Sequence, residues 1–196
     1  MSDPKTPLEA GNYYHIYNRG INSCDIFREP GNYEYFLKLY EKHINPIADT
    51  YAWVLMPNHF HILIRIHDDV DVIRIDQTGF ENLSGIINKP PHQHFSNLFN
   101  AYSKAYNKYF NRHGSLFERP FRRKLIDNEV YLRTVLKYIH NNPLKHGFCS
   151  HPMEYPWSSY MDYTSGKLTE HQREILILLF EDIKNFKFVH EQKDDS

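Results

Sequence analysis

The stretch of residues 51–66, YAWVLMPNHFHILIRI, restricts the possible fold more than any other part of this chain. Its β-branched and aromatic residues on both sides of a Pro-Asn pair predict two apolar strands joined by a turn. Side chains alternate between the faces of a strand, so His59 and His61 should point to one side and Phe60 to the other. Two adjacent imidazoles form half of a divalent-metal site. The alternative is that both are ordinary polar residues on a solvated sheet face.

The rest of the chain contains the elements of a small sheet with helices. We expect, in order, a strand, a helix, the two strands above, a second helix, a fourth strand and a third helix, at residues 13–17, 32–44, 51–66, 96–112, 115–126 and 127–143. This order predicts an α+β fold of the split βαβ (ferredoxin/RRM-like) type. Helices should cover one face of an antiparallel sheet, and the other face should be open to a substrate.

The domain boundaries follow from changes in pattern along the chain. We expect a disordered N-terminus over residues 1–11, one folded domain over 12–148 and a C-terminal extension over 149–196 with one helix. Thr169 and Gln172 form a capping box that should begin this helix, which we expect to end near Asn185. Residues 67–94 read as a long connection, to which we assign no role.

Length and composition narrow the class of protein. A chain of 196 residues fits one domain with a real core. Two distant cysteines, Cys24 and Cys149, argue against a disulfide scaffold or a zinc knuckle. The chain shows no signal peptide and no apolar run of membrane-spanning length. We therefore expect a soluble, cytoplasmic protein without membrane contact.

Positive charge is concentrated locally, although the formal net charge is only −1. Residues 104–124 contain one acidic residue among seven basic ones: Lys104, Lys108, Arg112, Arg119, Arg122, Arg123 and Lys124. The first three are four residues apart and should line one flank of a helix. Such a flank is either a phosphate-binding surface or simply a solvated face.

Tyr138 and Asn142 stand four residues apart near the end of the third expected helix, so they should be neighbours on one flank. Tyr138 could be a structural aromatic, and Asn142 could merely terminate the helix. Alternatively, Tyr138 is a nucleophile and Asn142 supplies an oxygen ligand to the metal held by His59 and His61. Two imidazoles and a carboxamide would leave coordination positions open for phosphate oxygens.

Three ordered motifs carry a resemblance to a known family. They are MPNHFHIL at residues 56–63, FNRHGSLF at 110–117 and YIHNNPLKHG at 138–147. Together they resemble the HUH single-tyrosine transposases, and a YPWSSY segment at 155–160 and the C-terminal extension resemble their REP-associated branch. The resemblance spans about residues 13–160 and would make residues 12–148 the catalytic domain.

The resemblance implies a role for each matching residue. His59 and His61 match the metal-binding pair, Tyr138 matches the nucleophile, and Asn142 matches the third metal ligand. Many members have glutamine at this last position, and asparagine is one methylene shorter. The implied cofactor is a divalent metal, Mg²⁺ or Mn²⁺, and the implied intermediate is a 5′-phosphotyrosine.

The resemblance also implies the partner, which is single-stranded DNA folded into hairpins by inverted repeats. Such DNA would be held by the basic residues of segment 104–124, with Arg19 as a further phosphate contact. Two alternatives stay open: a DNA-hairpin-binding protein that does not cleave, and a metal-dependent nuclease that uses water. Both monomer and homodimer are compatible with the sequence.

Overall fold

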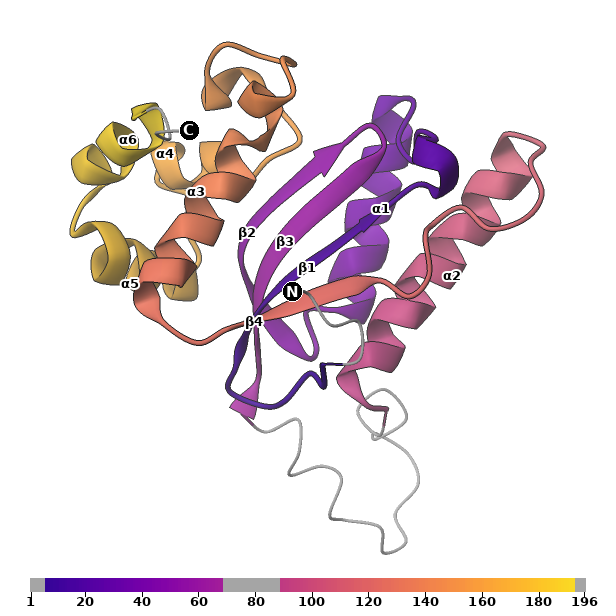
Figure 1. Ribbon diagram of the computed structural model, residues 1–196, viewed down its shortest axis with the longest axis horizontal. Coiled ribbons are helices and arrows are strands. Elements are labelled where there is room, and N and C mark those ends of the chain that lie inside the picture. Colours follow the sequence, from indigo (N-terminus) through magenta and orange to yellow (C-terminus); the bar gives the residue numbers. More distant parts are fainter. Residues whose placement is uncertain (1–5, 69–88, 193–196) are drawn as a thin grey trace, which may run out of the picture.

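The computed structural model describes residues 6–68 and 89–192, and within these residues the chain forms three layers (Figure 1). The middle layer is a four-stranded sheet with the spatial order β2-β3-β1-β4, in which every pairing is antiparallel. The strands are β1 (Tyr13–Arg19), β2 (Ala48–Met56), β3 (His59–Ile66) and β4 (Arg122–Ile126). Together with the two helices between them, this order confirms the split βαβ class of fold.

One face of the sheet is covered by α1 (Pro30–His43) and α2 (Pro91–Tyr109), which connect strands (Figure 1). Phe36 of α1 and Phe95 of α2 are fully buried there against Phe60 and Ile62 of β3. Burying aromatic and aliphatic area of this kind is the main stabilising contribution to such a layer. Phe60 thus points away from the face that carries His59 and His61, as the alternation predicts.

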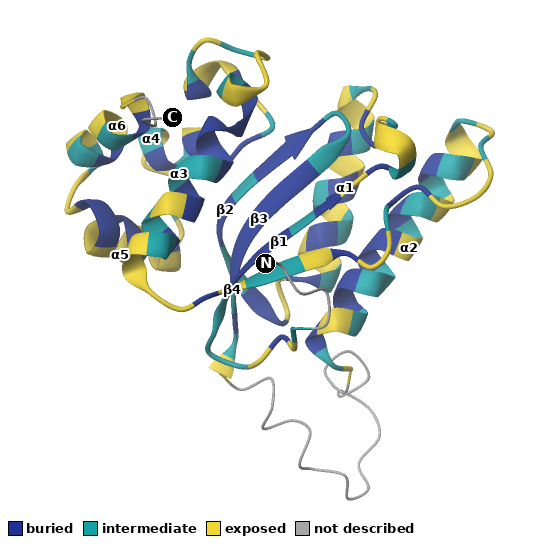
Figure 2. Cartoon of the chain, in the orientation of Figure 1, coloured by how far each residue is buried: buried dark blue, intermediate teal, exposed yellow. Residues whose placement is uncertain are grey.

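The opposite face is not as open as we expected. It is covered on its β2–β3 side by α3 (Glu129–Lys145) and α5 (Glu170–Phe180), and two further helices, α4 (Tyr160–Ser165) and α6 (Ile183–Glu191), pack with them in the same core. Leu136 and Ile139 of α3 pack there with Val54 of β2 and Leu63 of β3 into a second core. Figure 2 shows buried residues on both sides of the sheet. The exposed remainder of this face lies over β1 and β4.

The described part of the C-terminal extension, residues 149–192, therefore contains three α-helices where the sequence led us to expect one. The Thr169 and Gln172 capping box begins α5 as predicted. The helix then ends at Phe180 because Glu181 adopts a φ of 66° and Asp182 starts α6 by accepting a hydrogen bond from the Asn185 N–H. The apolar periodicity had concealed this break.

Several other boundaries differ from the expectation, among them the start of α2, which begins at Pro91 and not at Ser96. Residues 6–11 are ordered, because Leu8 is buried in the first core and the Gly11 N–H donates to the Ile66 carbonyl. Residues 1–5 lie outside the described residues, and so do residues 69–88 of the 67–94 connection. Helix α3 continues through Pro143 to Lys145, since a proline in the last turn removes only one backbone hydrogen bond.

The YPWSSY segment covers the outer edge of the sheet. Backbone hydrogen bonds join Leu55 N to Trp157 O at 2.9 Å and Ser159 N to Trp53 O at 3.0 Å. An edge strand exposes unpaired backbone groups, and this segment satisfies them for β2. It also fixes Ser159 beneath α3.

A buried chain of hydrogen bonds ties the C-terminal helices to α3. His190 Nδ1 lies 2.8 Å from the Phe186 carbonyl oxygen, and its Nε2 lies 3.1 Å from His140 Nδ1. His140 Nε2 in turn lies 2.9 Å from Ser159 Oγ. Burial keeps both imidazoles neutral, because it lowers the pKa of His190 to about 4 and the pKa of His140 to well below its ordinary value.

No helix in the described ranges is long and apolar enough to cross a membrane.

We predict that acid weakens the docking of α6. The unfolded chain takes up a proton on His190 near its ordinary pKa of 6.5, whereas the folded chain does so only near 4. The contribution of His190 to the free energy of unfolding should therefore be fully present above pH 6.5 and fall by roughly 3 kcal/mol towards pH 4. Urea unfolding followed by circular dichroism at pH 7 and pH 4.5 measures this. The fall should shrink in His190→Gln and persist in His113→Gln, an exposed control; equal falls in both variants would contradict the assignment.

Candidate active site on the exposed face of the sheet

The two histidines of the HFH motif point to the same face of β3, towards α3. Their rings lie 5.3 Å apart at an angle of 80°. The antiparallel register sets Tyr17 opposite His61 and Arg19 opposite His59, so both β1 side chains lie on this face as well. The sheet thus places four polar side chains together before any helix is added.

The turn before the motif is held from outside the hairpin. The Gly20 N–H donates to the Asn58 carbonyl at 2.8 Å, and the Ile26 N–H donates to the Pro57 carbonyl at 2.7 Å. A side chain at position 20 is excluded, because its Cβ would lie 2.0 Å from the Cys24 carbonyl oxygen. Asn58 is fixed in this way, and its Oδ1 lies 2.7 Å from His59 Nδ1.

Helix α3 brings the remaining two predicted residues to the histidines. Asn142 is buried, with its Oδ1 3.0 Å from His59 Nε2, and the Tyr138 hydroxyl lies 3.5 Å from His61 Nε2. The structure therefore brings His59, His61, Tyr138 and Asn142 into one place, although 77 residues separate His61 from Tyr138.

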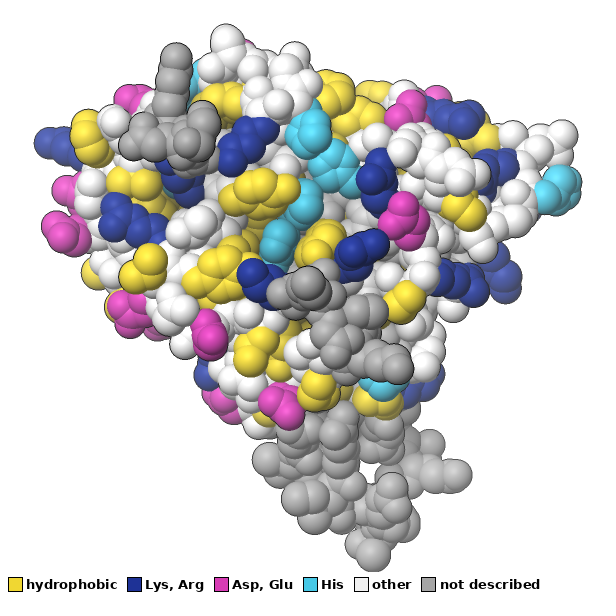
Figure 3. All heavy atoms as spheres, viewed as in Figure 1, with side chains coloured by type: hydrophobic (Ala, Val, Ile, Leu, Met, Phe, Trp, Pro, Cys, Tyr) yellow, Lys and Arg dark blue, Asp and Glu magenta, His cyan; other side chains and the backbone are white. Residues whose placement is uncertain are grey.

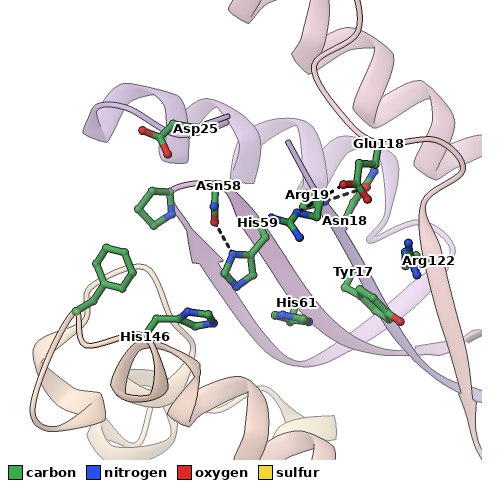
Figure 4. Close-up of a pocket in the computed structure, with 12 residues that line it drawn as sticks. Tyr17, Asn18, Arg19, Asp25, Asn58, His59, His61, Glu118, Arg122 and His146 are labelled. Carbon is green, nitrogen blue, oxygen red and sulfur yellow. Dashed lines mark hydrogen bonds and ion pairs between the residues drawn. The ribbon is translucent and has the colours of Figure 1, made fainter. Parts of the chain in front are cut away.

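Two of these side chains, His59 and His61, line a cleft of about 680 Å³ (Figure 4), whereas Tyr138 and Asn142 contact the two histidines without lining the cleft themselves. His59, His61 and His146 point into it, with Tyr17 and Arg122 on its β4 side. Figure 3 shows histidine side chains gathered at the centre of this hollowed face, with Lys and Arg side chains on either side. The cleft is open, so it suits a polymer strand better than an enclosed small molecule.

Burial keeps the two motif histidines neutral. It lowers the pKa of His59, and it lowers the pKa of His61 to well below its ordinary value, with His15, His59 and His146 nearby adding to the effect. A neutral imidazole has a lone pair available for a cation. If the His59 Nδ1–H donates to Asn58 Oδ1, the lone pair of His59 Nε2 faces the carbonyl oxygen of Asn142. Two lone pairs that face each other in this way can bind one cation between them.

The nitrogen of the Asn142 side chain also indicates a role in binding. Its Nδ2 is buried and has no hydrogen-bond partner among the described residues. A buried donor without a partner normally costs stability, which argues that the Asn142 side chain has a role other than stabilising the fold. In the described part of the chain, no group of three His, Cys, Asp or Glu side chains is arranged to hold a metal. Two imidazoles and the Asn142 carboxamide would fit a divalent cation that has further coordination positions open for oxygen ligands.

Tyr138 sits in a mixed environment. Half-burial raises the pKa of its hydroxyl, while Asn142 and the ammonium group of Lys145 act in the opposite direction. The Lys145 Nζ lies 5.2 Å from the centre of the Tyr138 ring. A phenol needs such positive charge, or a cation, to react as a nucleophile near neutral pH.

The predicted DNA-binding residues divide between different surfaces. Arg19, Arg122 and Lys124 lie on the same face as the histidines, although Arg19 also pairs with Glu118 at 3.6 Å. Arg123 and Arg119 line a second cleft next to α2.

The three residues predicted to form a basic flank belong to the α2 side. Lys104 and Lys108 are exposed on α2, which packs on the opposite face of the sheet. The Arg112 guanidinium donates to Asn107 Oδ1 and to the Ser115 carbonyl, so it stabilises its own turn. The structure does not bring these three next to the motif histidines.

Three residues at the site were missed from the sequence. His15 Nε2 lies 2.9 Å from His61 Nδ1, and the Tyr17 ring lies 5.5 Å from the His61 ring. The His146 ring lies 5.1 Å from the His59 ring. His146 could have been found, since it is four residues after Asn142. His15 and Tyr17 required the register between β1 and β3.

Fold and site together define a class: a split βαβ domain in which an H-x-H pair on the sheet faces a tyrosine and an asparagine on a following helix. Comparisons with known proteins agree. The chain is 28% identical over 116 residues to a Haemophilus influenzae protein (strain ATCC 51907 / DSM 11121 / KW20 / Rd) curated as "Putative REP-associated tyrosine transposase". This match covers 57% of the chain and 58% of that relative, so the chain spans little more than half the relative's length in the alignment.

The comparison with solved structures agrees with the sequence comparison. A REP-associated tyrosine transposase bound to a REP hairpin superposes with a TM-score of 0.60 at 18% identity, covering 86% of this chain and 88% of that one. No family model matches the sequence. The resemblance inferred from the three motifs is confirmed by these two proteins, and at this identity the structural match establishes the fold.

We predict that Asn142 is dispensable for stability. Asn142→Leu, which has a similar shape, removes the unpartnered Nδ2 together with the contact of Oδ1 to His59 Nε2, and these opposing effects should leave the free energy of unfolding of the metal-free protein within about 1 kcal/mol of the wild type. The neighbouring Asn141 is the matched control, because its Nδ2 donates to the His190 carbonyl at 2.9 Å. Asn141→Leu should cost about 1–3 kcal/mol. Urea unfolding in EDTA measures both; equal losses would mean that the Asn142 carboxamide is structural.

Proposed function

We propose that this protein is a tyrosine transposase that cleaves and rejoins single-stranded DNA carrying hairpins. The observation that carries the proposal is the convergence of Tyr138 and Asn142 on the two motif histidines, at hydroxyl-to-nitrogen and oxygen-to-nitrogen distances of 3.5 and 3.0 Å. A protein that only binds DNA has no need of all four groups at one edge of a cleft. The matching solved structure, of a REP-associated tyrosine transposase bound to a REP hairpin, supports the proposed hairpin partner.

In the proposed reaction, the Tyr138 hydroxyl oxygen attacks the phosphorus of a DNA phosphodiester. A bond forms between this oxygen and phosphorus, and the bond from phosphorus to the 3′-oxygen breaks. The phenol loses a proton and the 3′-oxygen gains one, which leaves a 5′-phosphotyrosine and a free 3′-hydroxyl. The covalent ester keeps the energy of the broken bond, so a 3′-hydroxyl can later reverse the step without ATP.

His59, His61 and Asn142 are proposed to hold a divalent cation, Mg²⁺ or Mn²⁺, next to Tyr138. When bound, such a cation neutralises charge on the phosphate and on the developing phenolate. The chain itself supplies the orientation: Asn58 fixes the ring of His59, and the packing of α3 on the sheet fixes Tyr138. Mn²⁺ and Mg²⁺ prefer oxygen ligands, so the two imidazoles would have to be combined with oxygen atoms. The carboxamide and the phosphate would provide these oxygen atoms.

The DNA backbone is proposed to follow the cleft along β1 and β4. Arg19 and Arg122 line the cleft, and Lys124 lies on the same face one pair further along β4. Tyr17, half-exposed in the cleft, offers a ring on which a base can stack. Lys104 and Lys108 would contact only DNA that extends around the sheet to α2.

We expect Tyr138→Phe to abolish the covalent intermediate. The substrate is single-stranded DNA containing the inverted repeats that flank the gene, incubated with Mn²⁺ or Mg²⁺ and analysed on denaturing gels. The wild type should give a metal-dependent protein–DNA adduct that is reduced at least a thousandfold in the variant. Tyr131→Phe, on the same helix, is the matched control and should keep the adduct.

The other outcomes distinguish the alternatives. Cleavage without an adduct, unchanged in Tyr138→Phe, would mean that water is the nucleophile. Retarded but uncut DNA with the wild type would mean a hairpin-binding protein without cleavage.

A second prediction concerns the DNA path. Arg122→Ala should weaken binding of single-stranded DNA to a similar extent for all sequences and lower the slope of log K against log salt by about 0.7, the value for one lost phosphate contact. Lys104→Ala, exposed on the α2 side, should change the slope much less. Fluorescence anisotropy at several salt concentrations measures both variants. Equal changes would place the DNA across α2 as well.

A further inference from the structure

The imidazole of His61 is engaged at both of its nitrogens. Its Nδ1 lies 2.9 Å from His15 Nε2, and its Nε2 lies 3.5 Å from the Tyr138 hydroxyl. An imidazole that offers a lone pair at one nitrogen carries its proton on the other. For Nε2 of His61 to face a cation or accept from Tyr138, its proton must therefore be on Nδ1, and that proton needs an acceptor.

His15 is the acceptor that the fold provides. It lies on β1, on the same face as Tyr17, and only 8% of its surface is exposed. Its ring packs 4.9 Å from Tyr17, 5.0 Å from His61 and 6.0 Å from Tyr138. These contacts hold the ring in place. In the described part of the chain, His15 is the only hydrogen-bond partner of His61 Nδ1.

His59 shows the same arrangement with a different partner. Its Nδ1 lies 2.7 Å from Asn58 Oδ1, and its Nε2 lies 3.0 Å from Asn142 Oδ1. Each motif histidine thus has its Nδ1 held by a neighbour and its Nε2 directed to the side where α3 lies. A hydrogen bond at the second nitrogen is the usual way in which proteins fix the tautomer of a metal-binding histidine. Asn58 is adjacent in sequence, whereas His15 reaches His61 only through the pairing of β1 with β3.

We propose that His15 is a positioning residue: by accepting the Nδ1–H of His61, it fixes the tautomer that presents the Nε2 lone pair to the divalent cation and to Tyr138. The cation in this statement rests on the proposed function, whereas the tautomer does not. Only one proton can lie between two nitrogens 2.9 Å apart. If it belonged to His15, the His61 proton would move to Nε2 and block the site.

A purely structural role for His15 makes a different prediction. Packing alone would be preserved by a phenylalanine ring, whereas the acceptor would be lost. A glutamine has the opposite properties, because its side-chain amide reaches about as far as Nε2 of histidine and offers an oxygen acceptor. His15→Phe and His15→Gln therefore separate the two roles.

The test uses two readouts on the full chain. In the metal-free protein, long-range ¹H–¹⁵N correlation spectra of ¹⁵N-histidine-labelled samples report which nitrogen of His61 carries the proton. In parallel, Mn²⁺ binding without DNA is followed by electron paramagnetic resonance. We expect His61 to be protonated on Nδ1 in the wild type and in His15→Gln, and on Nε2 in His15→Phe. The affinity for Mn²⁺ should fall about 10–100-fold in His15→Phe and much less in His15→Gln.

His94→Phe is a matched control, since His94 is equally buried but belongs to the first core side near α1, where its Nδ1 lies 3.1 Å from the His43 carbonyl. It should keep the wild-type affinity for Mn²⁺. Wild-type His61 protonated on Nε2 would overturn the proposal, and so would an unchanged affinity in His15→Phe. If His15→Phe does not fold, the wild-type tautomer and His15→Gln still decide. Failure of the wild type to form a DNA adduct would overturn the proposed reaction and leave the tautomer result standing.

Discussion

The site depends on the placement of one strand, β3, between β2 and β1. Phe60 is fully buried against α1 and α2, and this burial decides which way its two neighbours point. A shift of the strand by one residue would place Phe60 on the cleft side and both imidazoles in an apolar core, at the cost of a large desolvation penalty. The same packing that stabilises the first core therefore holds His59 and His61 on the face where α3 can reach them.

The geometry of the site also depends on helix α3. Tyr138 and Asn142 reach the histidines because Leu136 and Ile139, on the adjacent stripe of the helix, are buried against the sheet. The C-terminal helices support α3 in turn through the buried His140 and His190 pair. The extension thus contributes to the geometry of the site although none of its described residues lines the cleft.

The sequence was sufficient for the features that depend on local periodicity. Alternation along 51–66 placed His59 and His61 together, and the spacing of four placed Tyr138 and Asn142 on one flank. It was insufficient where distant segments meet. The contact from His15 to His61 spans 46 residues and depends on strand register. Helix α2 lies behind the sheet and so separates Lys104 from the cleft, and this position depends on the handedness of a crossover. Helix α4 was missed, and α5 was merged with the start of α6, because the apolar residues recur on both sides of the break at Glu181 and Asp182.

The central claim is that both motif histidines and a helix-borne oxygen hold one divalent cation beside Tyr138. The most direct measurement is pulsed electron paramagnetic resonance of Mn²⁺ bound to the full chain, with ¹⁵N-labelled histidine. The account predicts couplings from two histidine nitrogens, of which one disappears in His59→Ala. Bound Mn²⁺ without any histidine coupling would place the cation elsewhere and contradict the account.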